Sequence, residues 1–230
     1  MKPIFNAILK GVGTFLCLSM LIVDGQEERP REFALIRLVN AMAQGTGNLT
    51  LKINGNNAYD PGYKLGAITG GIAVTPGTHE VSVSKEGVME GSTKVNAPFG
   101  STTTIIPFAE KVPAKGDTPE YWEAKIIRLR QMEPIAARTI TFVSVASIDE
   151  LKVEIGTDGE HWETGYVKRK GLLQMPAQQA GGYTRLRIAG KELEPMAIPQ
   201  EGNYVVIIYE NDKGEVQSEN FLDLKALITD

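Results

Sequence analysis

The sequence predicts an all-β protein: two tandem antiparallel immunoglobulin-like β-sandwich domains behind an N-terminal signal segment. Three observations lead to this prediction. The 230 residues are 42% hydrophobic and 23% charged, which suits a globular chain that buries one or two ordinary cores. Short runs of alternating apolar and polar residues are separated by Gly and Pro, as in strands joined by turns. The order of these runs also occurs twice along the chain, which indicates an internal repeat.

The first 25 residues have the layout of a secretory signal. Lys2 and Lys10 precede an apolar stretch over residues 11–23, and Gly25 is a small residue at the position before a cleavage site. A permanent membrane anchor is the alternative, but a spanning helix needs roughly 20 apolar residues. We therefore expect cleavage of residues 1–25, a mature chain that starts near Gln26, and a periplasmic or extracellular location.

Cys17, the only cysteine, lies inside this segment. Lipid attachment there is not favoured, because lipoprotein cysteines follow the apolar run and small residues, whereas Phe15 and Leu16 precede this one. A mature chain without cysteine excludes disulfides, thiolate metal sites and cysteine nucleophiles.

Charge argues against a nucleic-acid partner. Cleavage removes two lysines and one aspartate, so the formal net charge goes from −4 to −5. Proteins that follow phosphates gather Lys and Arg on one face, and the only compact basic run is residues 168–170. We interpret that run as a solvated turn.

The first copy of the repeat opens with residues 36–41 (IRLVNA), and the second with residues 140–145 (ITFVSV). Each opening is followed by an alternating run, residues 49–53 (LTLKI) or 151–155 (LKVEI), whose period of two puts one face in a core and the other in water. Both copies therefore start with a strand and continue with a half-buried strand.

Further strands follow in the same order. In the first copy they are residues 80–84, 102–106 and 125–129, and in the second residues 185–189, 204–208 and 219–224. A turn at residues 211–214 (NDKG) joins the last two, since Asp and Gly tolerate hairpin dihedrals. The corresponding loop of the first copy, residues 109–119, is longer, and we interpret it as a mobile segment.

Pro134 lies in a stretch, residues 131–137, that we interpret as a linker because proline interrupts strand pairing. The domains are thus predicted to cover residues 33–132 and 138–227. Alternation assigns one set of side chains to the two cores and a second set to the solvent face. The predicted core set is Ile36, Leu38, Leu49, Leu51, Ile53, Val81, Val83, Ile105, Ile140, Phe142, Leu151, Val153, Ile155, Leu186, Ile188 and Ile207. The predicted solvent set is Arg37, Thr50, Lys52, Ser82, Thr141, Lys152, Glu154 and Arg187.

Three segments of the first copy resemble the bacterial DUF4397 family: residues 36–41 (IRLVNA), 51–55 (LKING) and 75–83 (TPGTHEVSV). The resemblance covers about 75 residues well; the second copy, with Ser144 in place of Asn40 and no Pro-Gly-Thr turn, matches weakly. The resemblance implies an exported β-sandwich of unknown function, often in tandem and compared with cell-adhesion modules. It implies no catalytic residues.

Residues that could carry out catalysis are few. The sequence has no Gly-x-Ser-x-Gly motif, and its two histidines are His79, expected on a strand surface, and His161. Asp158, Glu160 and Glu163 near His161 could supply ligands to a divalent ion, but a hairpin turn at residues 157–159 explains them as well, because neighbouring strand residues point to opposite faces. We predict no enzyme activity, no catalytic residues, no cofactor and no metal.

Aromatic side chains are the remaining route to a ligand, because exported sandwiches bind sugars through exposed rings. Tyr121, Trp122, Trp162 and Tyr166 are the tentative ligand-binding residues, with Tyr183 as a further candidate. The alternative is that the two tryptophans pack in the cores, one in each domain.

Export, duplication and the lack of catalytic motifs together suggest a non-catalytic structural or interaction module of the cell envelope, adhesion being one such role. The alternatives are a carbohydrate-binding accessory protein that uses exposed aromatic residues, and an envelope hydrolase. The expected partner is an envelope protein or polysaccharide; self-association is open. No nucleic acid and, after cleavage, no stable membrane span are expected.

Overall fold

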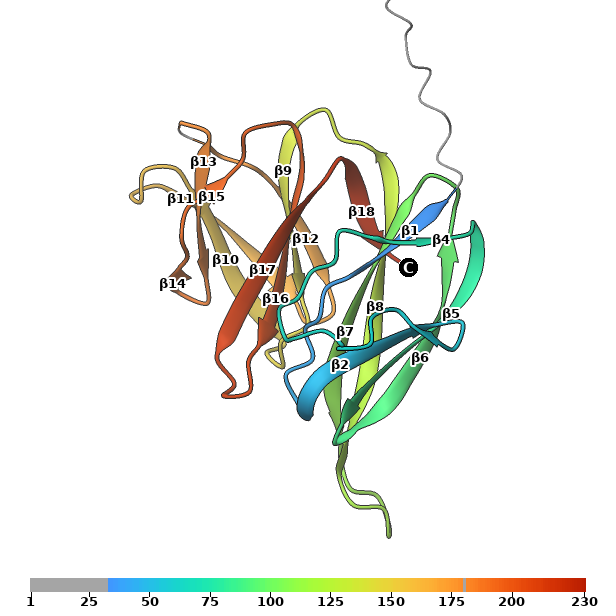
Figure 1. The fold of residues 1–230 in the computed structure, drawn as a ribbon. Coiled ribbons are helices and arrows are strands. Elements are labelled where there is room, and N and C mark those ends of the chain that lie inside the picture. Colours follow the sequence, from blue (N-terminus) through green and yellow to red (C-terminus); the bar gives the residue numbers. More distant parts are fainter. Residues whose placement is uncertain (1–32, 180) are drawn as a thin grey trace, which may run out of the picture. The chain divides into compact units, whose positions relative to one another are not determined.

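The computed structural model describes residues 33–179 and 181–230, and every regular element in this part of the chain is a β-strand (Figure 1). The all-β fold class predicted from the sequence is confirmed. Within the same residues there is no helix with the length and apolar character to span a bilayer. The predicted signal segment, with Cys17 and the cleavage site at Gln26, lies outside the described residues.

The strands fall into two sets that follow the two halves of the chain. In the first half they are β1 (Ala34–Leu38), β2 (Thr46–Ile53), β3 (Asn56–Asn57), β4 (Ile72–Val74), β5 (Gly77–Glu86), β6 (Val88–Ala97), β7 (Thr102–Val112) and β8 (Tyr121–Pro134). In the second half they are β9 (Arg138–Ser144), β10 (Glu150–Gly156), β11 (Trp162–Lys168), β12 (Leu172–Pro176), β13 (Tyr183–Ile188), β14 (Lys191–Glu192), β15 (Met196–Ala197), β16 (Gly202–Glu210), β17 (Val216–Asp223) and β18 (Lys225–Thr229).

Strand pairing in the second half repeats that of the first. In the first half, β1 pairs antiparallel with β4 and parallel with β7, and the other edge of β7 pairs with β8. In the second half, β9 pairs in the same way with β12 and β16, and the other edge of β16 pairs with β17. The second layer of each half centres on an antiparallel pair, β2 with β5 or β10 with β13. Most strand pairs are antiparallel, as predicted, but the sheets are mixed: β1 with β7, β9 with β16, and β6 with β8 through one bridge are parallel. The domain bounds and the immunoglobulin likeness stay predictions.

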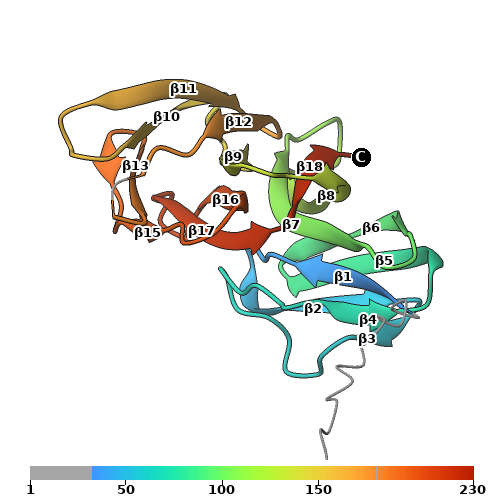
Figure 2. The same ribbon diagram turned by 90° about the horizontal axis from the view of Figure 1, so that it is seen from above.

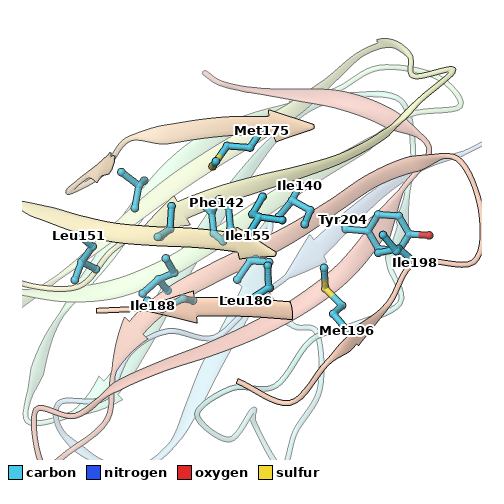
Figure 3. Close-up of a cluster of buried hydrophobic side chains, with 14 of the residues drawn as sticks. Ile140, Phe142, Leu151, Ile155, Met175, Leu186, Ile188, Met196, Ile198 and Tyr204 are labelled. Carbon is cyan, nitrogen blue, oxygen red and sulfur yellow. The ribbon is translucent and has the colours of Figure 1, made fainter. Parts of the chain in front are cut away.

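Three hydrophobic clusters fill the spaces between the layers of strands. Figure 2 shows the strands of the second half beside those of the first, with β18 next to β8. The first half encloses one cluster, which includes Ile36, Leu51, Val81 and Ile105. The second half encloses another, in which Phe142, Ile155 and Leu186 come from different strands and point into the same space (Figure 3). The third, here called the junction core, lies between the halves. It comprises Val39, Ala41, Ile106, Phe108, Leu129, Val143, Val145, Val205, Ile207, Tyr209 and Leu227.

The junction core makes β7 and β16 middle-layer strands that are buried on both faces. Ile105 points into the core of the first half, whereas the next residue, Ile106, points into the junction core. Val206 and Ile207 divide in the same way between the core of the second half and the junction. The prediction that Ile207 points into the core of its own domain is wrong: a strand buried on both faces is apolar throughout and shows no alternation.

The other predicted core side chains are confirmed as buried, except Ile53, which is half-buried. Two of the residues predicted to face solvent, Thr141 and Glu154, are buried. Thr141 lies on the middle-layer strand β9, where its hydroxyl is 2.6 Å from the side-chain oxygen of Asn203. Glu154 lies on the outer face of β10, where its Oε1 is 2.7 Å from Lys152 Nζ. Burial is tolerated in both cases because each polar group has a partner.

Two further predictions need correction. Much of the loop predicted over residues 109–119 is a regular extension of the β7–β8 hairpin, in which Val112 pairs with Tyr121 and Lys115 with Thr118. Pro134 does not lie in a linker but ends β8, where it is in register with Lys225 of β18. The last strand of the chain thus joins the sheet of the first half, which the sequence did not suggest.

Candidate functional site

A pocket of about 310 Å³ opens where the two halves meet. The first half contributes Ala41, Gln44, Phe108, Ala109, Glu110, Lys111 and Trp122, and the second half Val145, Ser147, Arg169 and Glu210. Its volume is at the lower end of the range of about 300 to 1,000 Å³ found for small-molecule sites. We call it the junction pocket.

The ends of the two opening strands create this pocket. After β1 ends at Leu38 the chain stays beside β7 only as far as Ala41, whose N–H donates to the carbonyl oxygen of Pro107 at 3.1 Å. The Ala109–Lys111 stretch of β7 therefore has an edge without a neighbouring strand, and this edge lines the pocket. The second half repeats the arrangement, with Val145 N–H donating to the Ile208 carbonyl oxygen at 2.8 Å.

Glu110 is held by two cations of the second half. Its Oε1 lies 2.6 Å from Lys170 Nζ and 3.2 Å from Arg169 Nη2. The hydrogen bond from Lys170 is the main cause that lowers the pKa of the Glu110 carboxyl. Arg169 Nε is buried and has no hydrogen-bond partner among the described residues. The interpretation of residues 168–170 as a solvated turn is thus wrong for Arg169, which is half-buried and lines the pocket.

The second carboxylate of the pocket fixes a loop. Glu210 accepts hydrogen bonds from the backbone N–H and the hydroxyl of Ser147, at 3.1 and 2.7 Å. Lys111, the remaining charged residue of the lining, pairs with Glu120 on the exposed hairpin at 2.9 Å. The formal charges of the lining residues therefore cancel, with two carboxylates against one lysine and one arginine.

Trp122 and Phe108 form the aromatic part of the pocket. Trp122 is half-buried and packs against the core of the first half as well as lining the pocket. Phe108 belongs to the junction core, and Lys170 Nζ lies 5.9 Å from the centre of its ring. Tyr121, the neighbour of Trp122, is half-buried and is absent from the pocket lining among the described residues.

Trp162 and Tyr166 lie elsewhere, on β11. The Trp162 indole N–H donates to the Gly159 carbonyl oxygen at 2.9 Å, and the Arg187 guanidinium lies 4.0 Å from its ring centre. A Cβ at Gly156 would come within 3.1 Å of the same ring, so glycine makes room for it. Tyr166 is 57% exposed on this strand. The structure thus does not bring the four predicted aromatic residues together.

The two histidines have ordinary structural surroundings. His161 is exposed, and Asp158 accepts hydrogen bonds from its backbone and its ring, which supports the turn interpretation over the metal alternative. These hydrogen bonds lower the pKa of the Asp158 carboxyl. His79 is buried, contrary to expectation; its ring nitrogens lie 2.9 Å from the Asn54 amide and 2.7 Å from the Thr75 carbonyl oxygen. No three His, Cys, Asp or Glu side chains of residues 33–179 and 181–230 are grouped so that they could hold a metal ion.

A second opening, of about 330 Å³, lies along the seam between β13–β14 and β17, lined in part by Ile188, Leu193 and Val216. In the first half a backbone bridge between Met89 and Glu123 joins the corresponding strands, β6 and β8. This opening is more apolar than the junction pocket and contains none of the predicted site residues.

Sequence reasoning missed Phe108, Glu110, Arg169 and Glu210. They lie up to 102 positions apart and become neighbours only when the halves pack. The basic run at residues 168–170 was the only signal in the sequence, and its partner Glu110 lay in a segment interpreted as a loop. The chain matches no known family model and no curated protein.

Proposed function

We propose that this chain is a non-catalytic interaction module of the bacterial cell envelope, exported through its N-terminal segment and of the DUF4397 type. The junction pocket is the observation that carries the proposal. Its walls come from both halves, and the buried side chains of the junction core, such as Val205 and Ile207, hold those walls. A site that is formed before the ligand arrives does not pay for ordering on binding.

The chemistry of the pocket supports binding rather than proton transfer. Glu110, with its lowered pKa, stays ionised at neutral pH, so it cannot serve there as a general acid and is a weaker base than an ordinary glutamate. Glu210 is committed to the backbone and hydroxyl of Ser147. Both carboxylates therefore act as fixed acceptors that orient a ligand or a loop.

Export is tested by mass spectrometry of the native protein. The basic start, the apolar run over residues 11–23 and Gly25 predict a chain that begins near Gln26. A native protein that retains Cys17, or carries lipid on it, would contradict the proposal of a soluble exported protein.

The interaction itself is tested with labelled protein spanning residues 26–230 and isolated envelopes of the producing cells. We expect saturable binding that unlabelled protein displaces. Protease treatment of the envelopes removes binding if the partner is a protein, and periodate oxidation removes it if the partner is a polysaccharide. Binding that does not saturate, or that heat-unfolded protein reproduces, would overturn the proposed function.

A further inference from the structure

We infer that the junction pocket holds one neutral sugar ring of an envelope or extracellular glycan. This inference rests on the proposed function and names the class of ligand. The site belongs to neither half alone, since its lining combines side chains such as Trp122 and Phe108 with Arg169 and Glu210 across the junction.

Charge favours a neutral ligand. The lining carries Glu110 and Glu210 against Lys111 and Arg169, so its formal charges sum to zero. An anion would meet two carboxylates at short range, and a cation would meet a guanidinium and an ammonium. A ligand without net charge avoids both repulsions.

Hydrogen bonding favours a ligand rich in hydroxyls. Arg169 Nε is a buried donor without a partner, while Glu110 and Glu210 each hold acceptor oxygens in the same lining. A hydroxyl is both a donor and an acceptor, so adjacent hydroxyls of one ring match this mixture. A ligand oxygen that reaches Arg169 Nε, an atom now covered from solvent, would satisfy this donor.

Aromatic surface and size complete the match. The half-buried Trp122 gives the pocket an aromatic side chain, whereas Phe108 is only 3% exposed, and an aromatic ring is a good partner for the apolar C–H face of a pyranose. The volume of about 310 Å³ suits a single ring rather than a long oligosaccharide. Trp162 offers no equivalent site, because its ring is already engaged by the Arg187 guanidinium, 4.0 Å from its centre, and packs close to Gly156.

The two tryptophans of the chain allow a direct test. In a Trp162→Phe background Trp122 is the sole indole, so its fluorescence reports on the pocket. The probes are glucose, galactose, mannose and N-acetylglucosamine, with glucuronic acid and glucosamine as charged counterparts. We expect a saturable change in Trp122 emission with at least one neutral sugar, and affinity for the charged counterparts at least about tenfold weaker.

Two variants change the pocket and one serves as a control. Gln44→Phe fills the pocket from its half-buried rim, and Arg169→Met removes the unpartnered donor. Gln174→Phe makes the same change as the first variant at an exposed position on β12, outside the pocket lining. Circular dichroism and denaturant midpoints verify folding. We expect both pocket variants to lose at least about tenfold in affinity and Gln174→Phe to bind as the parent does.

The inference is overturned if no neutral sugar gives a saturable change, if a charged sugar binds more tightly, or if folded Gln44→Phe binds as well as its parent. The proposed function fails separately. If Gln44→Phe still binds envelopes with parental affinity and only protease abolishes that binding, the interaction module stands and the sugar site falls.

Discussion

Asp223 is 3% exposed and gathers donors from distant parts of the chain. Its carboxylate accepts from the Arg37 guanidinium at 3.1 Å, from the Gln131 amide at 2.8 Å and from the Lys225 backbone N–H at 3.0 Å. Arg37 also lies over the Phe221 ring, 4.3 Å from its centre. This cluster joins β1, β8 and the β17–β18 corner, so one side chain connects the two halves.

Asp223→Ala should destabilise the protein by about 3 to 5 kcal/mol, because removing one partner of a buried pair leaves the other charge uncompensated. Urea denaturation followed by circular dichroism measures the loss. Asp117→Ala, in the exposed hairpin tip, is the matched control and should change stability by less than about 0.5 kcal/mol. Equal stabilities of the two variants would show that the cluster does not hold the halves together.

The half-buried Glu219 lies beside the buried Tyr209 at the junction. Burial raises the pKa of Glu219, and burial together with the Glu219 charge raises the pKa of Tyr209 to about 12. A carboxyl group whose pKa is higher in the folded state than in the unfolded state makes its full contribution to stability at pH values below its unfolded-state pKa. That contribution is lost as the pH rises through the folded-state pKa.

Glu219→Gln should therefore gain stability relative to wild type as the pH rises above the ordinary glutamate value of 4.5. Below that pH the relative gain should vanish, because the glutamate is then uncharged. Free energies of unfolding measured between pH 4 and pH 8 test this. The exposed Glu201→Gln substitution should give a flat difference over the same range, and a flat difference for Glu219→Gln would contradict the assignment.

At the scale of elements, β10 shows where the alternation of apolar and polar residues predicts burial correctly and where it does not. Leu151, Val153 and Ile155 are buried in the core of the second half, as the period of two predicts. On the opposite face Glu154 is buried as well, because Lys152 covers it at 2.7 Å and Arg187 lies 3.7 Å away. The polar face of this strand is thus a set of paired charges rather than a solvated surface.

Val153→Asp should strongly destabilise the protein, because it places an unpaired carboxylate in the apolar core of the second half. Lys152→Asp, for which sequence alone predicts tolerance, should also destabilise the protein, since it puts a second carboxylate beside Glu154. Lys152→Gln keeps a hydrogen-bond donor and should cost less than either. Urea midpoints rank the three variants, and a Lys152→Asp protein as stable as wild type would show that Glu154 does not depend on Lys152.

For the whole molecule, we expect the junction core to make the halves one cooperative unit. Residues that directly follow β1, and residues from β7 and β8, pack there against residues from β9 and β16, and β18 pairs with β8. Each half contains one tryptophan, Trp122 or Trp162. The two rings can therefore report separately on the unfolding of the two halves.

Single-tryptophan proteins, Trp162→Phe and Trp122→Phe, should each show one urea transition. In the Ile207→Ala background, each midpoint should fall, by an amount equivalent to about 2 to 5 kcal/mol, because the deleted side chain belongs to the core that both halves share. A matched Thr164→Ala change on the exposed side of β11 should leave both urea midpoints unchanged. If Ile207→Ala shifted only the Trp162 transition, the halves would be energetically independent.

The candidate site was only partly predictable. Trp122 was singled out as an aromatic residue beside a strand, and it does line the junction pocket. Glu110 and Arg169, by contrast, are ordinary charged residues in the sequence, 59 positions apart, and become a 3.2 Å pair only across the junction. Neither spacing nor composition indicates such a pair, because no local periodicity relates the two segments.

The sequence by itself determined the all-β fold class, the repeated order of strands and the buried faces of the outer strands, because side-chain direction in a strand follows a local period of two. Only the tertiary structure decided that Ile106 and Ile207 point into a third core, that β18 returns to β8, and that Glu110 meets Arg169. A middle-layer strand is apolar on both faces, so its sequence does not show which face packs against which neighbour. That choice depends on contacts between residues far apart in the chain.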